Sequence, residues 1–342
     1  MANSKILVTG GLGYIGSHTV VELINNDYEV VVIDDLSNSN LSVINGIEKI
    51  TGKKPLFYKT DMRDKSAMAD CFRENPGISA VVHFAAFKAV GESHEKPLAY
   101  YQNNLLSLIN LLDLLPMLKN KQIVFSSSCT VYGNPDKLPV TESAPFKPAL
   151  SPYGNTKRIS EEMLIDICSA DKSYKAISLR YFNPIGAHPS AHIGEMPQGI
   201  PNNLMPFVTQ TALGIRDELK IFGNDYDTPD GTCIRDYIHV TDLARAHVTA
   251  VDRMCRNQQD DNYEYFNLGT GKGVSVLEMV KSFERVSGKK LKYRFADRRP
   301  GDVPVVYADT TKANKVLGWK AKNNLDDTIR SAWNWEQNIR HS

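Results

Sequence analysis

Short apolar runs alternate with longer amphipathic stretches over the first half of the chain. The runs at residues 5–9, 29–33, 55–59, 80–85, 122–127 and 175–181 are rich in Val, Ile and aromatic residues and predict strands. Val30 to Ile33 are all apolar, which is typical of strands buried on both faces of a parallel sheet. The alternation of strand and helix therefore predicts an α/β fold with a doubly wound, Rossmann-type parallel sheet.

The character of the sequence changes after Phe182. Residues 183–203 are rich in Pro, Gly, His and Asn and form a passage longer than ordinary connections. We therefore predict a domain boundary here. The expected units are a Rossmann domain over 1–185, to which 236–258 return, and a smaller α/β domain over 186–342 that binds the substrate.

Composition narrows the class of protein. The chain has 342 residues, with 40 Lys and Arg against 39 Asp and Glu, so its net charge is +1 and nucleic acid is not an expected partner. The longest apolar stretch, 105–115, is interrupted by Ser107, Asn110 and Asp113, so no membrane span is expected. The N-terminus lacks the features of a secretory signal, which favours a cytoplasmic location. Five scattered cysteines without a Cys-x-x-Cys pair predict reduced thiols and no metal site.

A candidate dinucleotide site directly follows the first predicted strand. Gly10, Gly13 and Gly16 open a predicted helix, whose N-terminal N–H groups favour a pyrophosphate. Asp34 ends the second strand, where a carboxylate can accept hydrogen bonds from ribose hydroxyls and would repel a 2′-phosphate. Because no Arg lies between Asp34 and Tyr58 to pair with such a phosphate, the sequence favours NAD over NADP.

A candidate catalytic group lies further along the chain. Tyr153 is followed four positions later by Lys157, and Ser151 and Pro152 are typical of a helix start, so both side chains are predicted on one helix face. A nearby ammonium and a positive nicotinamide ring would lower the phenol pKa from about 10 toward about 7, which makes Tyr153 a candidate general base. Ser128 ends the fifth strand at the sheet's carboxyl edge and can hydrogen-bond the reacting hydroxyl.

These motifs resemble those of the extended short-chain dehydrogenase/reductase family and, within it, the UDP-glucose 4-epimerases. The resemblance covers essentially the whole chain, and its most specific passages are residues 84–93, 179–189, 201–206, 221–226 and 230–240. It implies an isomerase that interconverts UDP-galactose and UDP-glucose in galactose metabolism. The reaction would use transient hydride transfer to bound NAD through a 4-keto sugar, with UDP-N-acetylhexosamines as further candidate substrates.

The resemblance also implies roles for individual residues. The expected catalytic residues are Ser128, Tyr153 and Lys157. The expected cofactor contacts are Gly10, Gly13, Tyr14, Ile15, Gly16, Asp34, Asp35, Leu36, Ser37, Asn38, Ser39, Asp61, Met62, Phe84, Ala85, Ala86, Phe87, Lys88, Asn103, Ser128, Tyr153, Lys157 and Phe182. The expected substrate contacts are Lys88, Ser128, Tyr153, Asn183, Asn203, Leu204, Ile221, Phe222, Arg235, Arg299, Asp302 and Val306.

Three of these expectations concern how the substrate is held. Arg235 and Arg299 can each clamp a diphosphate oxygen, and Asp302 can accept a hydrogen bond from the uridine ribose. Val306 would border the sugar's 2-substituent. Since Val is smaller than the aromatic residue that confines this pocket in some relatives, UDP-N-acetylhexosamines are expected to react, less efficiently than plain hexoses.

The resemblance further implies a homodimer. Its interface would be a four-helix bundle made by the long predicted helices 98–119 and 153–170 of both subunits. The apolar residues expected to supply it are Leu105, Leu106, Ile109, Leu112, Met163, Leu164 and Ile167. The alternative is that these residues pack only on the sheet of their own subunit.

Two other functions were weighed. A nucleotide-sugar 4,6-dehydratase would carry an Asp-Glu pair after the Thr that follows strand five, but residues 128–132 contain no acid. A non-catalytic dinucleotide-sensing protein would be expected to lack Tyr153 or Lys157, and both are present. The sequence therefore favours the epimerase.

Overall fold

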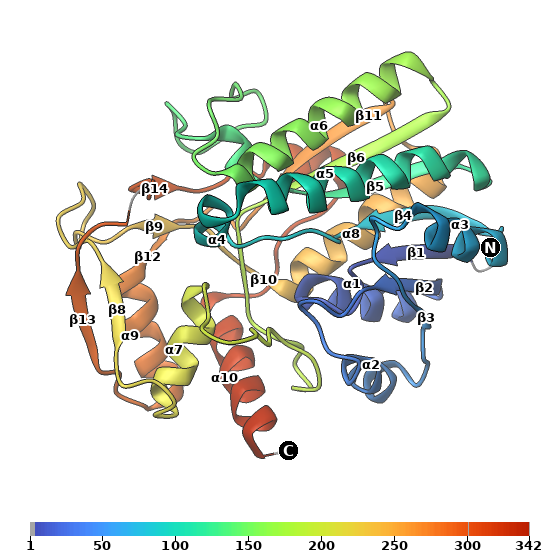
Figure 1. Ribbon diagram of the computed structural model, residues 1–342. Coiled ribbons are helices and arrows are strands. Elements are labelled where there is room, and N and C mark those ends of the chain that lie inside the picture. The colour runs from blue at the N-terminus through green and yellow to red at the C-terminus, as the bar shows by residue number, and fades with distance from the viewer. Residues whose placement is uncertain (1–3, 300, 342) are drawn as a thin grey trace.

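A seven-stranded parallel sheet forms the centre of the larger lobe (Figure 1). The computed structural model describes residues 4–299 and 301–341. The strand order is β11-β6-β5-β4-β1-β2-β3, and the pairings are parallel. The strands are β1 (Lys5–Thr9), β2 (Glu29–Asp34), β3 (Leu56–Lys59), β4 (Ile78–His83), β5 (Lys121–Ser128), β6 (Tyr174–Tyr181) and β11 (Tyr263–Leu268).

Helices cover both faces of this sheet. Ile6 and Val8 belong to the core shared with α1, α2 and α8, whereas Leu7 between them belongs to the core shared with α3, α5 and α6. Because both faces are covered, successive residues of a strand are apolar, and the predicted doubly wound Rossmann sheet is confirmed. The helices are α1 (Tyr14–Asn25), α2 (Val43–Thr51), α3 (Lys65–Glu74), α4 (Val90–Glu95), α5 (Pro97–Leu114), α6 (Pro152–Ala170) and α8 (Val240–Cys255).

The chain reverses direction across the sheet between β1 and β4. From β1 it proceeds outward to β2 and β3, and it then returns to β4 on the other side of β1. The connections after β1 and β4 therefore leave in opposite directions. In open α/β sheets this opens a crevice at the carboxyl ends of the strands, where ligands bind.

The smaller lobe lies beyond that edge and has its own core (Figure 1). Its sheets are short: β7 pairs with β10, β8 with β13, and β9 with both β12 and β14. Phe283 and Trp333 meet edge to face, with ring centroids 5.5 Å apart, and join two of its helices. The elements are β7 (Asn183–Ile185), β8 (Leu219–Phe222), β9 (Ile234–Arg235), β10 (Tyr237–His239), β12 (Val274–Ser275), β13 (Tyr293–Ala296), β14 (Val305–Val306), α7 (Leu204–Ala212), α9 (Val276–Ser287) and α10 (Leu325–His341).

Two features of the fold differ from the sequence prediction. The helix predicted over 98–119 ends at Leu114 and continues as a 3-10 turn over Leu115–Met117, because Pro116 has no N–H to donate to the helix. The sheet also has a strand that was not predicted, β11, which pairs with β6 from outside the segment 236–258. Its sequence, YEYFNL, is rich in aromatic residues, but Glu264 and Asn267 interrupt the apolar run that marks the other strands of this sheet.

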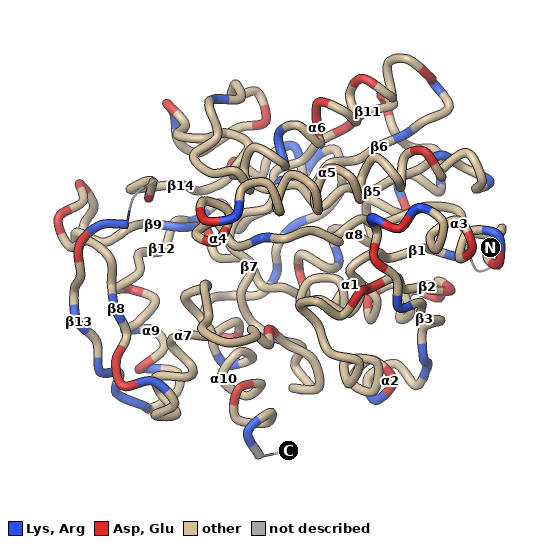
Figure 2. The backbone as a smooth tube through the Cα atoms, in the orientation of Figure 1, with Lys and Arg blue, Asp and Glu red and all other residues tan. Residues whose placement is uncertain are grey.

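Charged residues of both signs are mixed along the chain (Figure 2). Over residues 4–299 and 301–341, none of the helices is both long and apolar enough to cross a membrane.

Candidate active site

The turn after β1 requires glycine at two of its positions. Gly10 has φ +66°, and a Cβ there would lie 2.8 Å from the backbone nitrogen of Ala85. A Cβ on Gly16 would lie 2.1 Å from the carbonyl oxygen of Gly10. Gly13 is the N-cap of α1 and offers no side-chain cap to the first N–H groups of the helix. The result is a close-packed turn that leaves a helix N-terminus available to an anion.

Asp34 stands at the end of β2, beside this turn. Its side chain is buried and accepts hydrogen bonds from the backbone N–H groups of Leu12 and Leu36, each at 3.0 Å. The Ser39 hydroxyl donates to it at 2.7 Å. These bonds fix the carboxylate in one orientation, and the capacity of its two oxygens leaves room for a further donor such as a ribose hydroxyl.

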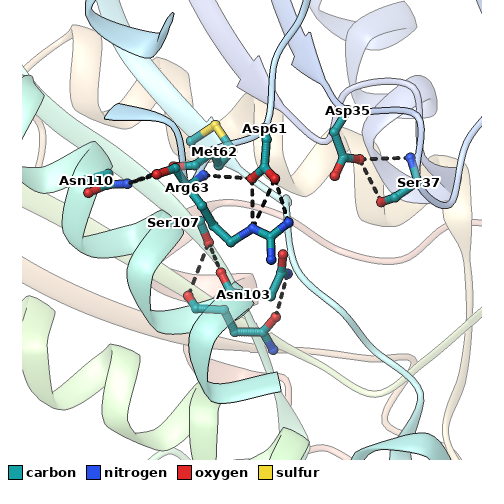
Figure 3. Close-up of polar contacts among 9 residues, drawn as sticks. Asp35, Ser37, Asp61, Met62, Arg63, Asn103, Ser107 and Asn110 are labelled. Atoms are coloured by element: carbon teal, nitrogen blue, oxygen red, sulfur yellow. Dashed lines mark hydrogen bonds and ion pairs between the residues drawn. The ribbon is translucent and has the colours of Figure 1, made fainter. Parts of the chain in front are cut away.

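Further expected cofactor residues lie in the loops that follow β2 and β3 (Figure 3). Asp61 pairs with Arg63, whose Nε lies 3.0 Å from Oδ1 and whose Nη2 lies 2.6 Å from Oδ2; this pairing holds the Asp61 pKa below its usual range. Asn110 donates to the carbonyl of Met62 at 3.1 Å, and Asp35 accepts from Ser37. Arg63 follows the arginine-free segment between Asp34 and Tyr58, and its guanidinium is already engaged by Asp61.

The predicted pairing of Tyr153 and Lys157 on one helix is present. Ser151 caps α6 by accepting from the N–H of Gly154 at 3.0 Å, with Pro152 as the first helical residue. Lys157 Nζ lies 6.0 Å from the centre of the Tyr153 ring. It donates to the carbonyl oxygen of Ser126 at 2.6 Å, which ties α6 to the end of β5.

The protonation of this pair differs from the sequence expectation. Burial raises the pKa of the Tyr153 phenol to about 12, and the hydrogen bond with Ser128 opposes this rise only in part. Burial lowers the pKa of Lys157 to about 7, against the attraction of Glu161. The expected fall of the phenol pKa is therefore not produced by the surrounding protein groups, because desolvation outweighs them. A low phenol pKa requires a further positive charge in the cleft.

The segment after β4 lies over the same edge. The ring of Phe84 packs at a tilt against that of His247, with centroids 4.6 Å apart, and the sequence did not indicate His247. The buried Asn104 holds the segment from α5: its Oδ1 accepts from the N–H of Phe87 at 2.8 Å, and its Nδ2 donates to the Phe87 carbonyl at 3.1 Å. Asn103, the predicted residue, donates to Asn104 at 3.1 Å. The available signal for Asn104 was a second Asn, next to Asn103, directly before the leucine-rich part of the helix.

Glu195 joins the two lobes and was also missed. Its Oε1 lies 3.1 Å from Lys88 Nζ, on the Rossmann side, and accepts from Asn203 Nδ2 at 2.5 Å, on the side of the smaller lobe. Its own carbonyl accepts from the indole N–H of Trp335 at 2.9 Å. Tyr14, the first residue of α1, donates to the carbonyl of Gly186 at 2.6 Å and makes a second link. The predicted Lys88 and Asn203 are therefore brought together by a carboxylate.

The predicted substrate residues of the smaller lobe differ in whether their side chains can reach a ligand. Arg235 and Arg299 converge on Asp302: Arg235 Nη2 lies 3.5 Å from Oδ1, and Arg299 Nε lies 3.0 Å from Oδ2. The Arg299 guanidinium also lies over the Phe222 ring, 4.8 Å from its centre. The side chain of Ile221, by contrast, is buried in the core of the lobe, so a ligand can meet only its backbone.

The remaining predicted residues line the junction of the lobes. Val306 pairs with Arg235 in the register of β14 and β9, and it packs on the cluster that contains Phe182 and Val131. Asn183 begins β7, and Leu204 begins α7. Within residues 4–299 and 301–341, no group of three or more His, Cys, Asp or Glu residues could hold a metal ion.

Comparison with known proteins places this arrangement among nucleotide-sugar enzymes. Residues 7–332 match a family model described as GDP-mannose 4,6 dehydratase. The chain is 54% identical over 331 residues to the UDP-glucose 4-epimerase of Bacillus subtilis, which covers 97% of this chain and 96% of that protein. It is 49% identical to the UDP-glucose 4-epimerase of Drosophila melanogaster, over 98% of this chain and 97% of that protein.

Solved structures give the same result. The UDP-glucose 4-epimerase from Bifidobacterium longum, in complex with NAD+ and UDP, superposes with a TM-score of 0.94 at 46% identity, over 98% of this chain and 99% of that chain. The UDP-Glc/GlcNAc 4-epimerase from Campylobacter jejuni has a TM-score of 0.84 at 37% identity, over 98% and 100%.

Proposed function

The chain belongs to the UDP-glucose 4-epimerase family, and we propose that it interconverts UDP-galactose and UDP-glucose in galactose metabolism, with NAD as its resident cofactor. The observation that supports this proposal is that α6 carries Tyr153 and Lys157 to the end of β5, where Lys157 donates to the Ser126 carbonyl, while the glycine turn follows β1 of the same parallel sheet. We assign to this edge a base and a dinucleotide cradle, with Arg235 and Arg299 of the smaller lobe as the diphosphate clamp.

The residues present fit NAD. The close-packed Gly10 and Gly16 let backbone approach the pyrophosphate, the start of α1 offers it N–H groups, and Asp34 offers the ribose an acceptor. The buried Asp34 carboxylate disfavours a 2′-phosphate, which supports NAD over NADP. When bound, NAD accepts a hydride from carbon 4 of the sugar and returns it, so it is regenerated in each turnover.

Tyr153 acts as the general base that takes the proton from the sugar's 4-hydroxyl. The Ser128 hydroxyl, at the end of β5, lowers the pKa of this phenol and can relay that proton. Lys157 stands a turn away and favours the phenolate when it is charged. A 4-keto sugar results on oxidation, and the proton held by Tyr153 returns to oxygen 4 when the other face is reduced.

UDP anchors the substrate while the sugar turns. Arg235 and Arg299 share the single carboxylate of Asp302, so this cluster keeps a net positive charge for the diphosphate. Asp302 is in turn free to accept from the uridine ribose when the arginines turn to phosphate. Few directional contacts to the hexose are required, since the keto sugar must present both faces.

Substrate breadth depends on Val306. Its side chain is half-buried at the junction of the lobes and is smaller than an aromatic residue. A 2-acetamido group can therefore be accommodated, and we propose UDP-N-acetylhexosamines as secondary substrates. The dual activity named for the Campylobacter jejuni relative supports this breadth within the fold.

We assign the cofactor to residues 1–185 with 236–258, to which β11 adds the last strand of the sheet, and the UDP-sugar to the remainder of 186–342. The packing of α8 on the core of the Rossmann sheet supports this division. A cytoplasmic location and a homodimer are further parts of the proposal. The dimer is supported by the apolar side chains that α5 and α6 leave exposed, namely Leu98, Leu106, Ile109 and Ile165.

Not all the apolar residues expected at a dimer interface are free for that role. Leu112 and Leu164 are buried in the core of their own subunit. Leu105, Met163 and Ile167 are partly buried. Leu106 and Ile109, each 41% exposed, therefore remain the principal candidates on α5.

The 4,6-dehydratase named by the family model is the alternative that a simple experiment separates. After β5 the chain continues as Cys129–Tyr132, without the acidic pair that dehydration requires. Purified protein is incubated with UDP-galactose and, separately, with GDP-mannose, and products are identified by NMR. We expect UDP-glucose from the first and no 4-keto-6-deoxy sugar from the second; the reverse pattern would overturn the proposal.

A further inference from the structure

A buried ion pair lies beneath the catalytic helix. Glu161 of α6 and Arg180 of β6 have side chains that are 0% and 3% exposed. Arg180 Nη2 lies 2.5 Å from Glu161 Oε2, and Arg180 Nε lies 2.9 Å from Oε1. Two parallel contacts of this kind fix the relative orientation of the two side chains, and hence of the helix and the strand.

Other groups complete the coordination of this pair. The hydroxyls of Ser127 and Tyr263 both donate to Glu161, the latter at 2.7 Å. Arg180 Nη1 donates to the hydroxyl of Tyr132 at 2.9 Å, and the guanidinium lies 4.2 Å from the centre of the Tyr265 ring. The carboxylate thus joins α6, β5, β6 and β11 at one point.

The same point supports two of the proposed catalytic residues. Glu161 follows Lys157 by four positions, so the two side chains leave α6 one turn apart on the same side. Three consecutive residues at the end of β5 are involved: the Ser126 carbonyl accepts from Lys157, the Ser127 hydroxyl donates to Glu161, and Ser128 directly follows them. Movement of Glu161 would therefore move Lys157 and Ser128 relative to Tyr153.

We propose that Glu161, fixed by Arg180, is a positioning residue of the epimerase reaction, which holds the end of β5 against α6 and keeps the Lys157 ammonium charged beside Tyr153. The inference rests on the proposed function. It explains why a charged pair occupies this site, because a buried ion pair contributes little net stability compared with apolar residues of the same volume. The proposed role of the ion pair, which is to fix the position and the charge of Lys157, accounts for its presence.

The surroundings of Lys157 bear on its charge. The other titratable and charged groups near Lys157, Glu161 or Tyr153 are His83 on β4, Tyr100 on α5, Cys129 and Tyr132 after β5, Arg180 and Tyr181 on β6, and Tyr263 on β11. Burial lowers the pKa of His83 to about 3, so it is neutral at working pH. Glu161 is the carboxylate in this set, and it favours the charged form of Lys157.

The test removes both charges together. Glu161→Gln alone would leave Arg180 buried without its counter-charge, so the principal variant is the double replacement Glu161→Leu with Arg180→Met, which keeps volume and leaves no unpaired ion. We expect it to fold and to retain NAD, with kcat reduced about 10- to 100-fold, KM little changed, and the alkaline limb of the kcat profile moved to lower pH by about one unit.

A matched control comes from the opposite face of the sheet. Arg253 of α8 and Glu264 of β11 form a similar fork, with contacts of 2.8 Å, and both are largely buried. Replacing them by Met and Leu removes a pair of the same chemistry remote from Lys157. This variant should keep the wild-type kcat and pH profile, whatever its melting temperature.

Two further measurements keep the outcome decisive. If the double variant does not fold, Ser127→Ala removes one bond between β5 and Glu161. It should lower kcat about threefold and the melting temperature by only a few degrees, so that the protein still folds. Titration of Lys157 by NMR in protein labelled at the lysine ε-carbon reads the ammonium without turnover. Its midpoint should fall in the double variant.

A wild-type kcat and pH profile in the folded double variant, or an unchanged kcat in Ser127→Ala if that variant must serve, would overturn the inference. An unmoved Lys157 midpoint would do so as well. Failure of the proposed function would show differently, as a wild-type protein that does not convert UDP-galactose while its Lys157 titration still responds to Glu161.

Discussion

Lys157 holds its ammonium 6.0 Å from the centre of the Tyr153 ring, one turn further along α6. Burial raises the pKa of the phenol to about 12 and lowers that of the lysine to about 7, so burial shifts both side chains toward their neutral forms. Base catalysis requires the opposite, a phenolate beside an ammonium. The site is therefore built so that this charged pair forms when a cationic ring and a substrate hydroxyl enter the cleft.

Replacement of Tyr153 by Phe removes the base and leaves the ring in place. We expect kcat to fall by roughly 10² to 10⁴, as is typical of acid–base groups. Folding and NAD content should be nearly unchanged, as checked by circular dichroism and by assay of the cofactor released on denaturation. Near-normal turnover by this variant would refute the assignment of the base.

Lys157 makes stability depend on pH in a definite direction. Its folded pKa of about 7 lies below the unfolded value of about 10.4, so folding releases a proton between these values. The burial penalty is fully present below about pH 7 and disappears above about pH 10.4, at up to about 1.4 kcal/mol per pH unit crossed. Lys157→Met should therefore raise the melting temperature, relative to wild type, more at pH 6 than at pH 10.

The activity of the same variant gives the second half of this prediction. Without an ammonium beside Tyr153, activity should fall and its pH dependence should move to higher pH, because the phenolate forms later. Equal stability differences at both pH values would show that Lys157 is charged in the folded protein throughout.

Val306 tests substrate breadth. Val306→Tyr should suppress conversion of UDP-N-acetylglucosamine by about 10- to 200-fold and spare UDP-glucose, since a pocket contact of this kind discriminates by about 1 to 3 kcal/mol. Val306→Gly is the control and should increase the acetamido activity. If wild type lacks that activity and the Gly variant does not create it, another residue sets the limit.

Association is tested on α5. Light scattering at micromolar concentration should give about twice the chain mass of 38.2 kDa. The double replacement Leu106→Glu with Ile109→Glu puts charges on the exposed apolar face and should yield monomers, whereas Ile215→Glu, at a similarly exposed site on the smaller lobe, should not. A wild-type mass near 38.2 kDa would exclude the dimer.

The local parts of this structure could be predicted from sequence, and the non-local parts could not. The strand 5–9, the glycine turn and the capped start of α6 at Ser151 each depend on residues close together in the chain. The strand β11, by contrast, was not predicted, because it contains the charged residue Glu264. In the structure Glu264 is buried and accepts hydrogen bonds from Arg253 of α8.

The same limit applies to the candidate site. Glu161 and Glu195 read as ordinary acidic residues, and their importance appears only when Arg180 and Lys88 are brought to them by the fold. The pKa of the Tyr153 phenol in the protein alone could not be predicted for a related reason. Sequence spacing reveals a neighbouring charge but not the degree of burial, and here burial is the larger effect.

The central claim is that carbon 4 of the sugar is oxidised and reduced within one site that carries its own cofactor. It is tested by incubating freshly purified protein, without added NAD, with UDP-galactose deuterated at carbon 4. The account predicts UDP-glucose that retains the deuterium at carbon 4. Loss of the label to water, or no conversion until NAD is supplied for each turnover, would contradict it.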